Sequence, residues 1–235
     1  AQDSDDTLAH ASAALQILND DLAENGCTLV LDLTPSKDRI YREYMPAGYP
    51  IVNEQNRTDL MVEYLRLHTT VPVVWQYETL RSQARLYPER LLYYKTDTHW
   101  NELGALIGLD GVLEALGLPT LAPEEYTVTS DGTTTGDMAN VAALYAVLPE
   151  EVRYTVPGYE TLFPRDERVV RVIGDSFSEA YMPYLEDRFA SCWREHIDTF
   201  DPAIAEAPAC DILILEFNER SLDTMLRILE NFHPE

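Results

Sequence analysis

The feature that most constrains the fold of this chain is an alternation of amphipathic helical segments with short apolar runs. Before Gly26, apolar residues recur at three- and four-residue steps, which predicts one buried helix face: Leu8, Ala11, Leu15, Leu18 and Leu22. Residues 27–33 then form a β-branched, apolar run typical of a buried strand, and Pro35 ends that run. A helix followed by a buried strand is the basic unit of α/β folds.

The same unit recurs along the chain. Helices are predicted over 55–67, 101–116 and 221–229 and in a stretch after Gly174 that reaches Leu185, and strands over 71–75, 169–173 and 212–215. Gly104 and Gly108 are expected to allow close backbone contact, and periodicity fades over 119–168 into loops and short strands. We therefore expect a single domain, residues 1–235, with a three-layer α/β fold and a mostly parallel central sheet.

The charge balance narrows the possible functions. The sequence holds 17 Lys and Arg residues against 41 Asp and Glu residues, a formal net charge of -24. This balance argues against nucleic acid and against an anionic membrane surface as partners. The sequence has no run of 18 apolar residues, so no membrane span is expected. The chain begins with Ala1 rather than Met, which fits a mature or trimmed chain whose signal or anchor has been removed.

The three cysteines do not form a recognisable metal or redox motif. Cys27, Cys192 and Cys210 have neither metal-ligand spacing nor a Cys-x-x-Cys arrangement, so no metal site is expected. Cys27 opens an apolar run and is expected to be buried. A bridge between Cys192 and Cys210 stays open as an alternative if the compartment is oxidising.

A polar block follows the predicted strand at 169–173. In open parallel sheets, ligands gather at the carboxyl ends of strands, where Gly174, Asp175, Ser176 and Phe177 lie. The glycine permits a tight turn that would present the Ser176 hydroxyl at a helix start, where backbone N–H groups can stabilise an oxyanion. Ser176 is therefore a candidate nucleophile, and the alternative is a plain helix cap.

A second polar block, Asp97-Thr98-His99-Trp100-Asn101, precedes the predicted helix at 101–116. An activated serine needs an imidazole to accept its proton, and the imidazole needs an acceptor on its other nitrogen. At a spacing of two residues, Asp97 and His99 could meet if the loop curls. The alternative makes Asp97 a helix cap and His99 a surface side chain.

The two blocks together resemble the SGNH hydrolase-like domain of the AlgX/AlgJ family of bacterial polysaccharide O-acetyltransferases, and also the related DHHW families. Ordinary SGNH esterases carry the serine block first, whereas in the AlgX/AlgJ type the Asp-x-His block precedes it, as Asp97 and His99 precede Ser176 here. The resemblance implies a permuted SGNH-like fold over nearly the whole chain. It also implies a catalytic triad of Ser176, His99 and Asp97.

Weaker motifs extend the resemblance: Pro35-Ser36-Lys37, Gly136-Asp137-Met138, and Glu216 with Glu219-Arg220. By similarity, the Gly136-Asp137 loop would lie near the active site, and Asn140 or the Ser176 N–H could serve the oxyanion hole. Glu216 and Arg220 could instead form a structural ion pair, since they are four residues apart.

Long polar side chains and aromatic rings are suited to a sugar-binding cleft. The candidate substrate-binding residues are Lys37, Trp100, Asn140 and Arg220, with Arg39, Tyr93 and Tyr94 as further possible lining residues. The acidity of the chain disfavours an anionic polymer, so a neutral or amino-sugar glycan is the expected substrate.

The leading hypothesis is a serine enzyme that moves or removes O-acetyl groups on a cell-surface or secreted polysaccharide, with no cofactor and no metal. The resemblance further implies an extracytoplasmic bacterial location and a membrane-bound partner as acyl donor. One alternative is a non-catalytic glycan-binding or scaffold component of a polysaccharide export or modification complex. A second alternative is an α/β domain in which both blocks are only helix caps.

Overall fold

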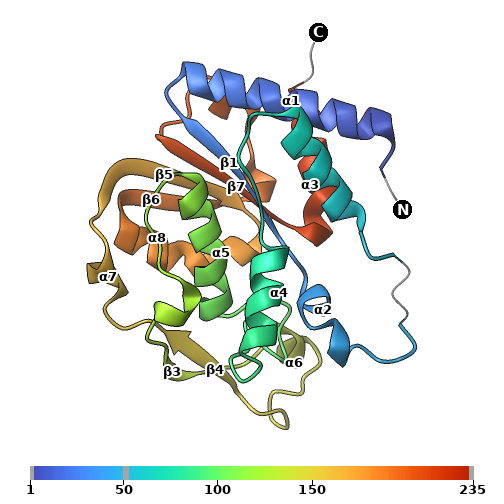
Figure 1. Ribbon diagram of the computed structural model, residues 1–235, viewed down its shortest axis with the longest axis vertical. Coiled ribbons are helices and arrows are strands. Elements are labelled where there is room, and N and C mark those ends of the chain that lie inside the picture. Colours follow the sequence, from blue (N-terminus) through green and yellow to red (C-terminus); the bar gives the residue numbers. More distant parts are fainter. Residues whose placement is uncertain (1–2, 50–52, 233–235) are drawn as a thin grey trace.

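The computed structural model describes residues 3–49 and 53–232 (Figure 1). Its strands are β1 (Thr28–Thr34), β2 (Val73–Trp75), β3 (Thr129–Thr134), β4 (Glu151–Thr155), β5 (Asp166–Gly174), β6 (Phe189–His196) and β7 (Ile212–Asn218). Its α-helices are α1 (Asp5–Glu24), α2 (Lys37–Ile40), α3 (Arg57–His68), α4 (Tyr77–Leu86), α5 (Glu102–Ala115), α6 (Asp137–Val141), α7 (Tyr159–Leu162), α8 (Met182–Arg188) and α9 (Leu222–Leu229). A 3-10 helix, η3 (Ser176–Tyr181), joins β5 to α8.

The central sheet has five parallel strands in the order β2-β1-β7-β5-β6. The first and last described strands, β1 and β7, are neighbours in its middle, with Thr28 opposite Ile212 and Asp32 opposite Glu216. Because all five strands run the same way, their carboxyl ends meet at one edge, where loops can bring distant residues together.

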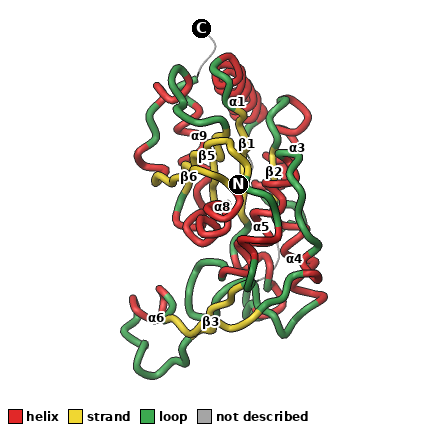
Figure 2. The backbone as a smooth tube through the Cα atoms, turned by 90° about the vertical axis from the view of Figure 1, so that its left-hand side faces the viewer, coloured by secondary structure: helices red, strands yellow, loops and turns green. Residues whose placement is uncertain are grey.

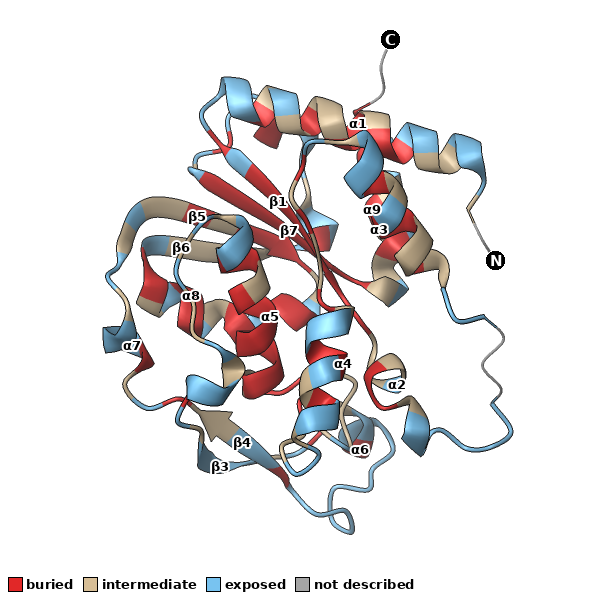
Figure 3. Ribbon diagram, viewed as in Figure 1, coloured by how far each residue is buried: buried red, intermediate tan, exposed pale blue. Residues whose placement is uncertain are grey.

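Helices cover both faces of this sheet, which gives the three layers that the sequence predicts. Helices α1, α3 and α9 pack on one face, against the side chains of Leu29, Leu31 and Leu33 in β1. Helices α4, α5 and α8 pack on the other face, where Val30 points. Since both faces are covered, β1 and β7 are buried along almost their whole length (Figure 3).

The predicted strands and long helices are confirmed, but the edge strand β6 and helix α4 were missing from the prediction, as were the short helices α2, α6 and α7. The edge strand β6 contains Arg194, Glu195 and His196 and is only partly buried, so its sequence lacks the apolar run of the central strands. Helix α4 directly follows β2 and buries only Leu80, Arg81 and Ala84, which leaves a weak apolar pattern.

A small antiparallel hairpin of β3 and β4, with α6 between them in sequence, occupies the region predicted to hold loops and short strands. Figure 2 shows this part extending from the layered body. Among the described residues, no helix combines the length and apolarity needed to cross a bilayer.

The suggested pairing of Cys192 with Cys210 is wrong. Cys192 packs against the core on the α5 face of the sheet, whereas Cys210 packs against the core on the α1 face. The neighbour of Cys210 is Cys27, which is buried as predicted.

Candidate active site

At the carboxyl edge of the sheet, two hydrogen bonds connect the three residues predicted to act in catalysis. His99 Nε2 lies 2.7 Å from Ser176 Oγ, and His99 Nδ1 lies 2.7 Å from Asp97 Oδ1. Ser176 is exposed to solvent, whereas His99 and Asp97 are partly buried. The fold therefore brings together two sequence blocks that are 77 residues apart.

The turn that carries Ser176 is held by the neighbouring residue Asp175. Its Oδ1 accepts the N–H of Phe177 at 2.9 Å, so Asp175 rather than Ser176 is the cap of η3. Its Oδ2 accepts the N–H of Asn218 and the hydroxyl of Ser221, both at 2.9 Å. The Ser176 side chain is thus released from the capping role proposed as its alternative.

Arg194 of β6 holds the same turn from the other side. Its Nη2 donates to the carbonyl of Asp175 at 2.7 Å, and its Nε donates to the hydroxyl of Ser178 at 2.6 Å. Charge-assisted hydrogen bonds of this kind fix the backbone on both sides of Ser176.

The loop that carries His99 curls back on itself. Asp97 Oδ1 accepts both the backbone N–H and the ring nitrogen Nδ1 of His99, at 2.9 and 2.7 Å. Asn101 then caps helix α5 by accepting the N–H of Gly104 at 3.0 Å. The curl that the sequence could only suggest is therefore made by the Asp97 carboxylate itself.

Asp137 is a site residue whose role sequence reasoning missed. Its Oδ1 accepts the Thr98 N–H at 2.9 Å, its Oδ2 accepts the Thr98 hydroxyl at 2.7 Å, and its own N–H donates to Asp97 Oδ2 at 2.8 Å. A Cβ at position 136 would overlap the Thr96 carbonyl, so only glycine allows this approach. The Gly-Asp motif was a signal for the loop, but sequence reasoning singled out Asn140 in it.

Electrostatics in the site favour an ionised Asp97 beside a basic His99. The hydrogen bond with Asp97 raises the pKa of His99 above its ordinary value; burial and Arg220 oppose this, and the charge of Asp137 supports it. Although burial disfavours its charged form, hydrogen bonds from His99 and Asp137 hold the pKa of Asp97 well below its usual range. This arrangement suits an imidazole that accepts a proton from Ser176.

Lys37 lies beside the site, but its ammonium group is hydrogen-bonded to backbone carbonyls of the protein. Its Nζ donates to the carbonyls of Tyr94 and Lys95, both at 3.0 Å, and of Asp97 at 2.5 Å. An ammonium group has three donor hydrogens, so these contacts satisfy it fully. The prediction that Lys37 reaches sugar hydroxyls is wrong, because its head group binds the backbone of the Asp97 loop.

Trp100 is also not a sugar-binding residue. Only 1% of its surface is exposed, and its Nε1 donates to the Phe177 carbonyl at 2.8 Å. A Cβ on Gly108 of α5 would lie 2.7 Å from the Trp100 ring, a side-chain contact. The close backbone contact predicted for the two glycines is found at Gly104, where a Cβ would overlap the Leu92 carbonyl. Trp100 therefore links the His99 loop to the Ser176 turn inside the core.

Arg220 and Asn140 remain candidates for substrate contact. Arg220 is exposed, its Nε donates to Asn218 Oδ1 at 2.9 Å, and its guanidinium lies 5.6 Å from the centre of the Phe177 ring, beside Ser176. Asn140 is exposed in α6. The suggested ion pair of Arg220 with Glu216 is wrong, because Glu216 is fully buried and accepts from the Thr34 hydroxyl at 3.1 Å.

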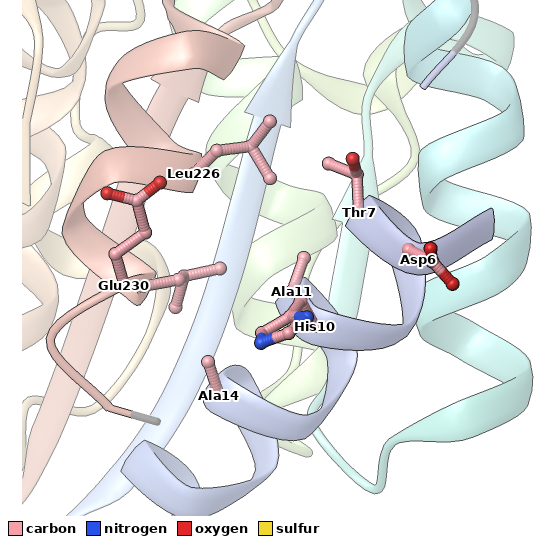
Figure 4. A pocket seen from close by; sticks show the side chains of 8 residues that line it. Asp6, Thr7, His10, Ala11, Ala14, Leu226 and Glu230 are labelled. Atoms are coloured by element: carbon pink, nitrogen blue, oxygen red, sulfur yellow. The ribbon is translucent and has the colours of Figure 1, made fainter. Parts of the chain in front are cut away.

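Two grooves differ in their relation to this site. One groove of about 650 Å³ borders the Asp97 loop. Its lining includes the rings of Tyr41, Tyr44 and Tyr94 and the side chains of Lys37 and Lys95. The other, of about 290 Å³, lies between α1 and the α9 segment, as Figure 4 shows, and no residue of the candidate site lines it. The first groove borders the Asp97 loop, but neither Ser176 nor His99 is among the residues that line it.

Asp97, His99 and Asp137 offer ligand atoms within 4.8 Å of one another, a spacing that a metal ion could use. All four carboxylate oxygens of the two aspartates already accept hydrogen bonds from this loop region. The cluster is therefore satisfied without an ion, and the expectation of no metal stays a prediction.

Comparison with known proteins identifies a matching family. A family model described as "SGNH hydrolase-like domain, acetyltransferase AlgX" matches residues 1–193. A probable alginate O-acetylase AlgJ of Pseudomonas putida is 24% identical over 170 residues, which are 70% of this chain and 42% of that protein. The chain thus spans about two fifths of the curated relative that it matches.

Solved structures show the same fold. The O-acetyltransferase domain of Pseudomonas putida AlgJ superposes with a TM-score of 0.63 at 19% identity, over 96% of this chain and 91% of that one. A DHHW family protein from Eubacterium siraeum superposes with a TM-score of 0.66 at 16% identity, over 100% and 91% of the two chains.

Proposed function

Since the chain belongs to the family of SGNH hydrolase-like domains of the acetyltransferase AlgX type, we propose that it catalyses serine-dependent acyl transfer on O-acetyl groups of a polysaccharide. The observation that carries this proposal is the unbroken hydrogen-bonded series from Ser176 through His99 to Asp97, with both links at 2.7 Å. Three residue types in the order nucleophile, base and orienting carboxylate are what acyl transfer at a serine requires.

In the proposed reaction, Ser176 Oγ attacks the acetyl carbonyl while His99 Nε2 accepts its proton. Asp97 holds the ring with Nδ1 protonated, so that Nε2 faces the serine, and it stabilises the imidazolium that forms. The N–H of Ser176, at the first position of η3, is the proposed donor to the oxyanion. His99 then returns the proton to the departing oxygen, which leaves an acetyl group on Ser176.

The acceptor that takes the acetyl group decides between transferase and esterase. A sugar hydroxyl activated by His99 gives O-acetylation, whereas water gives hydrolysis. The name of the Pseudomonas relative, probable alginate O-acetylase, supports a polysaccharide acceptor. Its alginate is not carried over, because a net charge of -24 disfavours a polyanion.

The proposed setting is extracytoplasmic. Such polymers lie in the periplasm, at the bacterial cell surface or in the secreted material outside it. The reaction needs an activated acetyl donor, and we propose that a membrane-bound partner delivers it. The exposed position of Ser176 supports delivery by a separate molecule, since the nucleophile can be reached from solvent.

The test compares acetyl release from p-nitrophenyl acetate by the wild-type chain and by Ser176→Ala, His99→Ala and Asp97→Ala. Each variant is expected to lower kcat by roughly 10²–10⁴-fold. Ser130→Ala, in the exposed strand β3, is the matched control and should keep full activity. Wild-type protein should also carry one acetyl group on a peptide that contains Ser176, as measured by mass spectrometry. Four proteins of equal activity would overturn the nucleophile assignment.

A non-catalytic, glycan-binding role is the second candidate. The groove of about 650 Å³ favours it, because the groove is lined by tyrosine rings of a kind that stack on sugars. Tyr44, which is 71% exposed, is the ring on which binding would depend most visibly. Saccharide binding that Tyr44→Ala weakens, in a protein without acetyl transfer, would favour this role.

A further inference from the structure

Two cysteines far apart in sequence meet at the amino-terminal edge of the sheet. Cys27 directly precedes β1, and Cys210 lies two residues before β7. The strands pair from their first residues, with Thr28 opposite Ile212 and the Thr28 N–H donating to the Asp211 carbonyl at 2.9 Å. This edge is opposite the one that carries Ser176, so the thiols take no part in the chemistry proposed above.

The two sulfur atoms are close enough to bond after a small adjustment. Cys27 Sγ lies 3.6 Å from Cys210 Sγ, and a disulfide bond measures roughly 2.05 Å. Bond formation therefore requires the two sulfur atoms to approach by about 1.5 Å. Cys192 cannot compete for either partner, because it packs on the other face of the sheet.

The surroundings assign an order of reaction to the thiols. The hydrogen bond from Cys27 lowers the pKa of Cys210, and the nearby Arg171 guanidinium adds to this effect. Arg171 is held at this edge by hydrogen bonds to the Pro208 carbonyl, at 3.3 Å, and to Glu195, at 2.8 Å. Cys210 is also partly exposed, whereas Cys27 is 2% exposed. Cys210 therefore has both the thiolate character and the access that the attacking thiol needs.

We propose that Cys27 and Cys210 form a disulfide that joins the amino-terminal ends of β1 and β7, made by exchange with an external disulfide oxidant. The Cys210 thiolate attacks one sulfur of the oxidant, forms a mixed disulfide and releases the first thiolate. Cys27 then loses its proton and attacks Cys210 Sγ, which releases the second thiolate. Two electrons pass from the two cysteines to the oxidant, which is reduced to two thiols.

The bond would close a loop between positions 183 residues apart in sequence. A cross-link of this length restricts the unfolded chain strongly and should raise Tm by roughly 5–15 °C. Because it pins only the far edge of the sheet, it should leave the rate of acetyl release unchanged within about twofold. The disulfide can therefore form whether or not Ser176 is the nucleophile.

The experiment equilibrates the wild-type chain with oxidised or reduced glutathione, unfolds it, and counts free thiols by N-ethylmaleimide labelling and intact mass. We expect one labelled cysteine, Cys192, after oxidation, and labelling of Cys27, Cys192 and Cys210 after reduction. A peptide map should contain Cys27 linked to Cys210. Three labelled cysteines after oxidation, a link that includes Cys192, or a disulfide between two chains would each overturn the proposal.

Cysteine variants distinguish the effect of the disulfide on Tm from a general loss of stability caused by the substitution. Cys192→Ser is the matched control and should keep the difference in Tm between oxidised and reduced protein. Cys27→Ser and Cys210→Ser should each abolish that difference. If either variant fails to fold, the thiol count of the wild-type chain still decides the question.

Discussion

Among single residues, Lys37 holds the proposed catalytic loop without touching the reacting atoms. Its three hydrogen bonds hold the carbonyls of Tyr94, Lys95 and Asp97. We expect Lys37→Met to lower kcat for p-nitrophenyl acetate by about 10–100-fold, because Asp97 and His99 would lose their fixed geometry. KM should change by less than about threefold, since Lys37 has no donor left for substrate.

Lys95 provides the matched control, because it is the only other lysine in the sequence and its side chain is exposed. Lys95→Met should retain wild-type kcat. The pH profile adds a readout that a loss of stability would not move. If Lys37 positions Asp97, Lys37→Met displaces the carboxylate that raises the pKa of His99, so that pKa falls. The low-pH limb of the plot of kcat against pH, which the titration of His99 sets, should then move to lower pH. An unchanged kcat and an unchanged limb would contradict the positioning role.

Glu216 leads to a prediction about stability and pH. Burial raises its pKa well above the usual range, and the neighbouring Asp175 and Asp32 add to the effect. The folded chain therefore keeps a proton that the unfolded chain releases, so the free energy of unfolding falls as pH rises. Because burial raises the pKa of Asp32 to about 7, that group contributes mainly below neutral pH. The contribution of Glu216 to this slope should approach roughly 1.4 kcal/mol per pH unit between the pKa of an unfolded glutamate and the raised pKa of the folded chain.

Glu216→Gln should remove the part of this slope that Glu216 contributes, because an amide has no proton to lose. It can still accept from the Thr34 hydroxyl, which now donates to Glu216 Oε1 at 3.1 Å. Urea unfolding at several pH values from about 5 upward measures the effect, with Glu219→Gln as a control at a neighbouring, less buried position. Equal slopes for wild type and Glu216→Gln would show that Glu216 is ionised in the folded chain.

The sequence identified some residues of the candidate site and missed or misassigned others, and the difference has a physical reason. Ser176, His99 and Asp97 were selected from their motifs and their order, and the structure brings the three side chains into hydrogen-bond contact. Their catalytic roles stay a prediction. Trp100 was misassigned because a neighbour of His99 in an extended stretch points the opposite way, into the core. Lys37 and Asp137 act through backbone contacts across long sequence distances, and no local pattern encodes such contacts.

At the scale of elements, the contact between the Asp97 loop and α6 sets the geometry of the site. The Thr96 carbonyl accepts the N–H groups of Met138 and Ala139 at 3.1 and 3.2 Å, directly beside Gly136. Gly136→Ala would insert a methyl group at this carbonyl. We expect the loop to shift and kcat to fall by about 10–100-fold, with stability lower by roughly 1–3 kcal/mol.

Gly48→Ala is the matched control, because a Cβ there meets no atom within 4 Å. It should leave kcat and Tm close to wild type. Both variants are measured by p-nitrophenyl acetate turnover and thermal unfolding. A Gly136→Ala protein with wild-type kcat would mean that the contact between loop and α6 does not position Asp97.

Elements were predictable where burial leaves a pattern in the sequence. The central strands β1 and β7 are buried on both faces and read as continuous apolar runs. The edge strand β6 is half-exposed, and its charged residues hide its strand character. The region over 119–168 showed only that regular periodicity stops, because the β3–β4 hairpin is exposed and α6 has five residues.

At the scale of the whole molecule, the sheet order supports one folding unit over residues 1–235, which we propose as a single domain. Strand β7, from the end of the chain, pairs with β1 from its beginning, and both cores share this strand pair. We expect a single unfolding transition in urea, with coincident midpoints by circular dichroism and tryptophan fluorescence. Two separated midpoints would instead indicate two units.

The net charge of -24 gives the last prediction, which concerns substrate class. A negatively charged protein repels anionic substrates over distances comparable with the Debye length, which falls from about 30 Å at 0.01 M salt to about 3 Å at 1 M. We expect kcat/KM for an anionic ester, 4-acetoxybenzoate, to rise several-fold, by roughly tenfold at most, across that range. The value for neutral p-nitrophenyl acetate should change by less than about twofold, which controls for effects of salt on the protein itself.

A value of kcat/KM for the anionic ester that falls as salt is added would lead to a different conclusion about the substrate. If the anionic ester reacts faster at low salt, a local positive field must outweigh the net charge at Ser176. Arg220 is the candidate for that field, since it is exposed and its guanidinium lies against the Phe177 ring, next to the nucleophile. Arg220→Gln should then abolish the salt effect on the anionic ester and leave the neutral ester unchanged. In that case an anionic polysaccharide would again become a reasonable acceptor, because recognition would depend on the local field and not on the total charge.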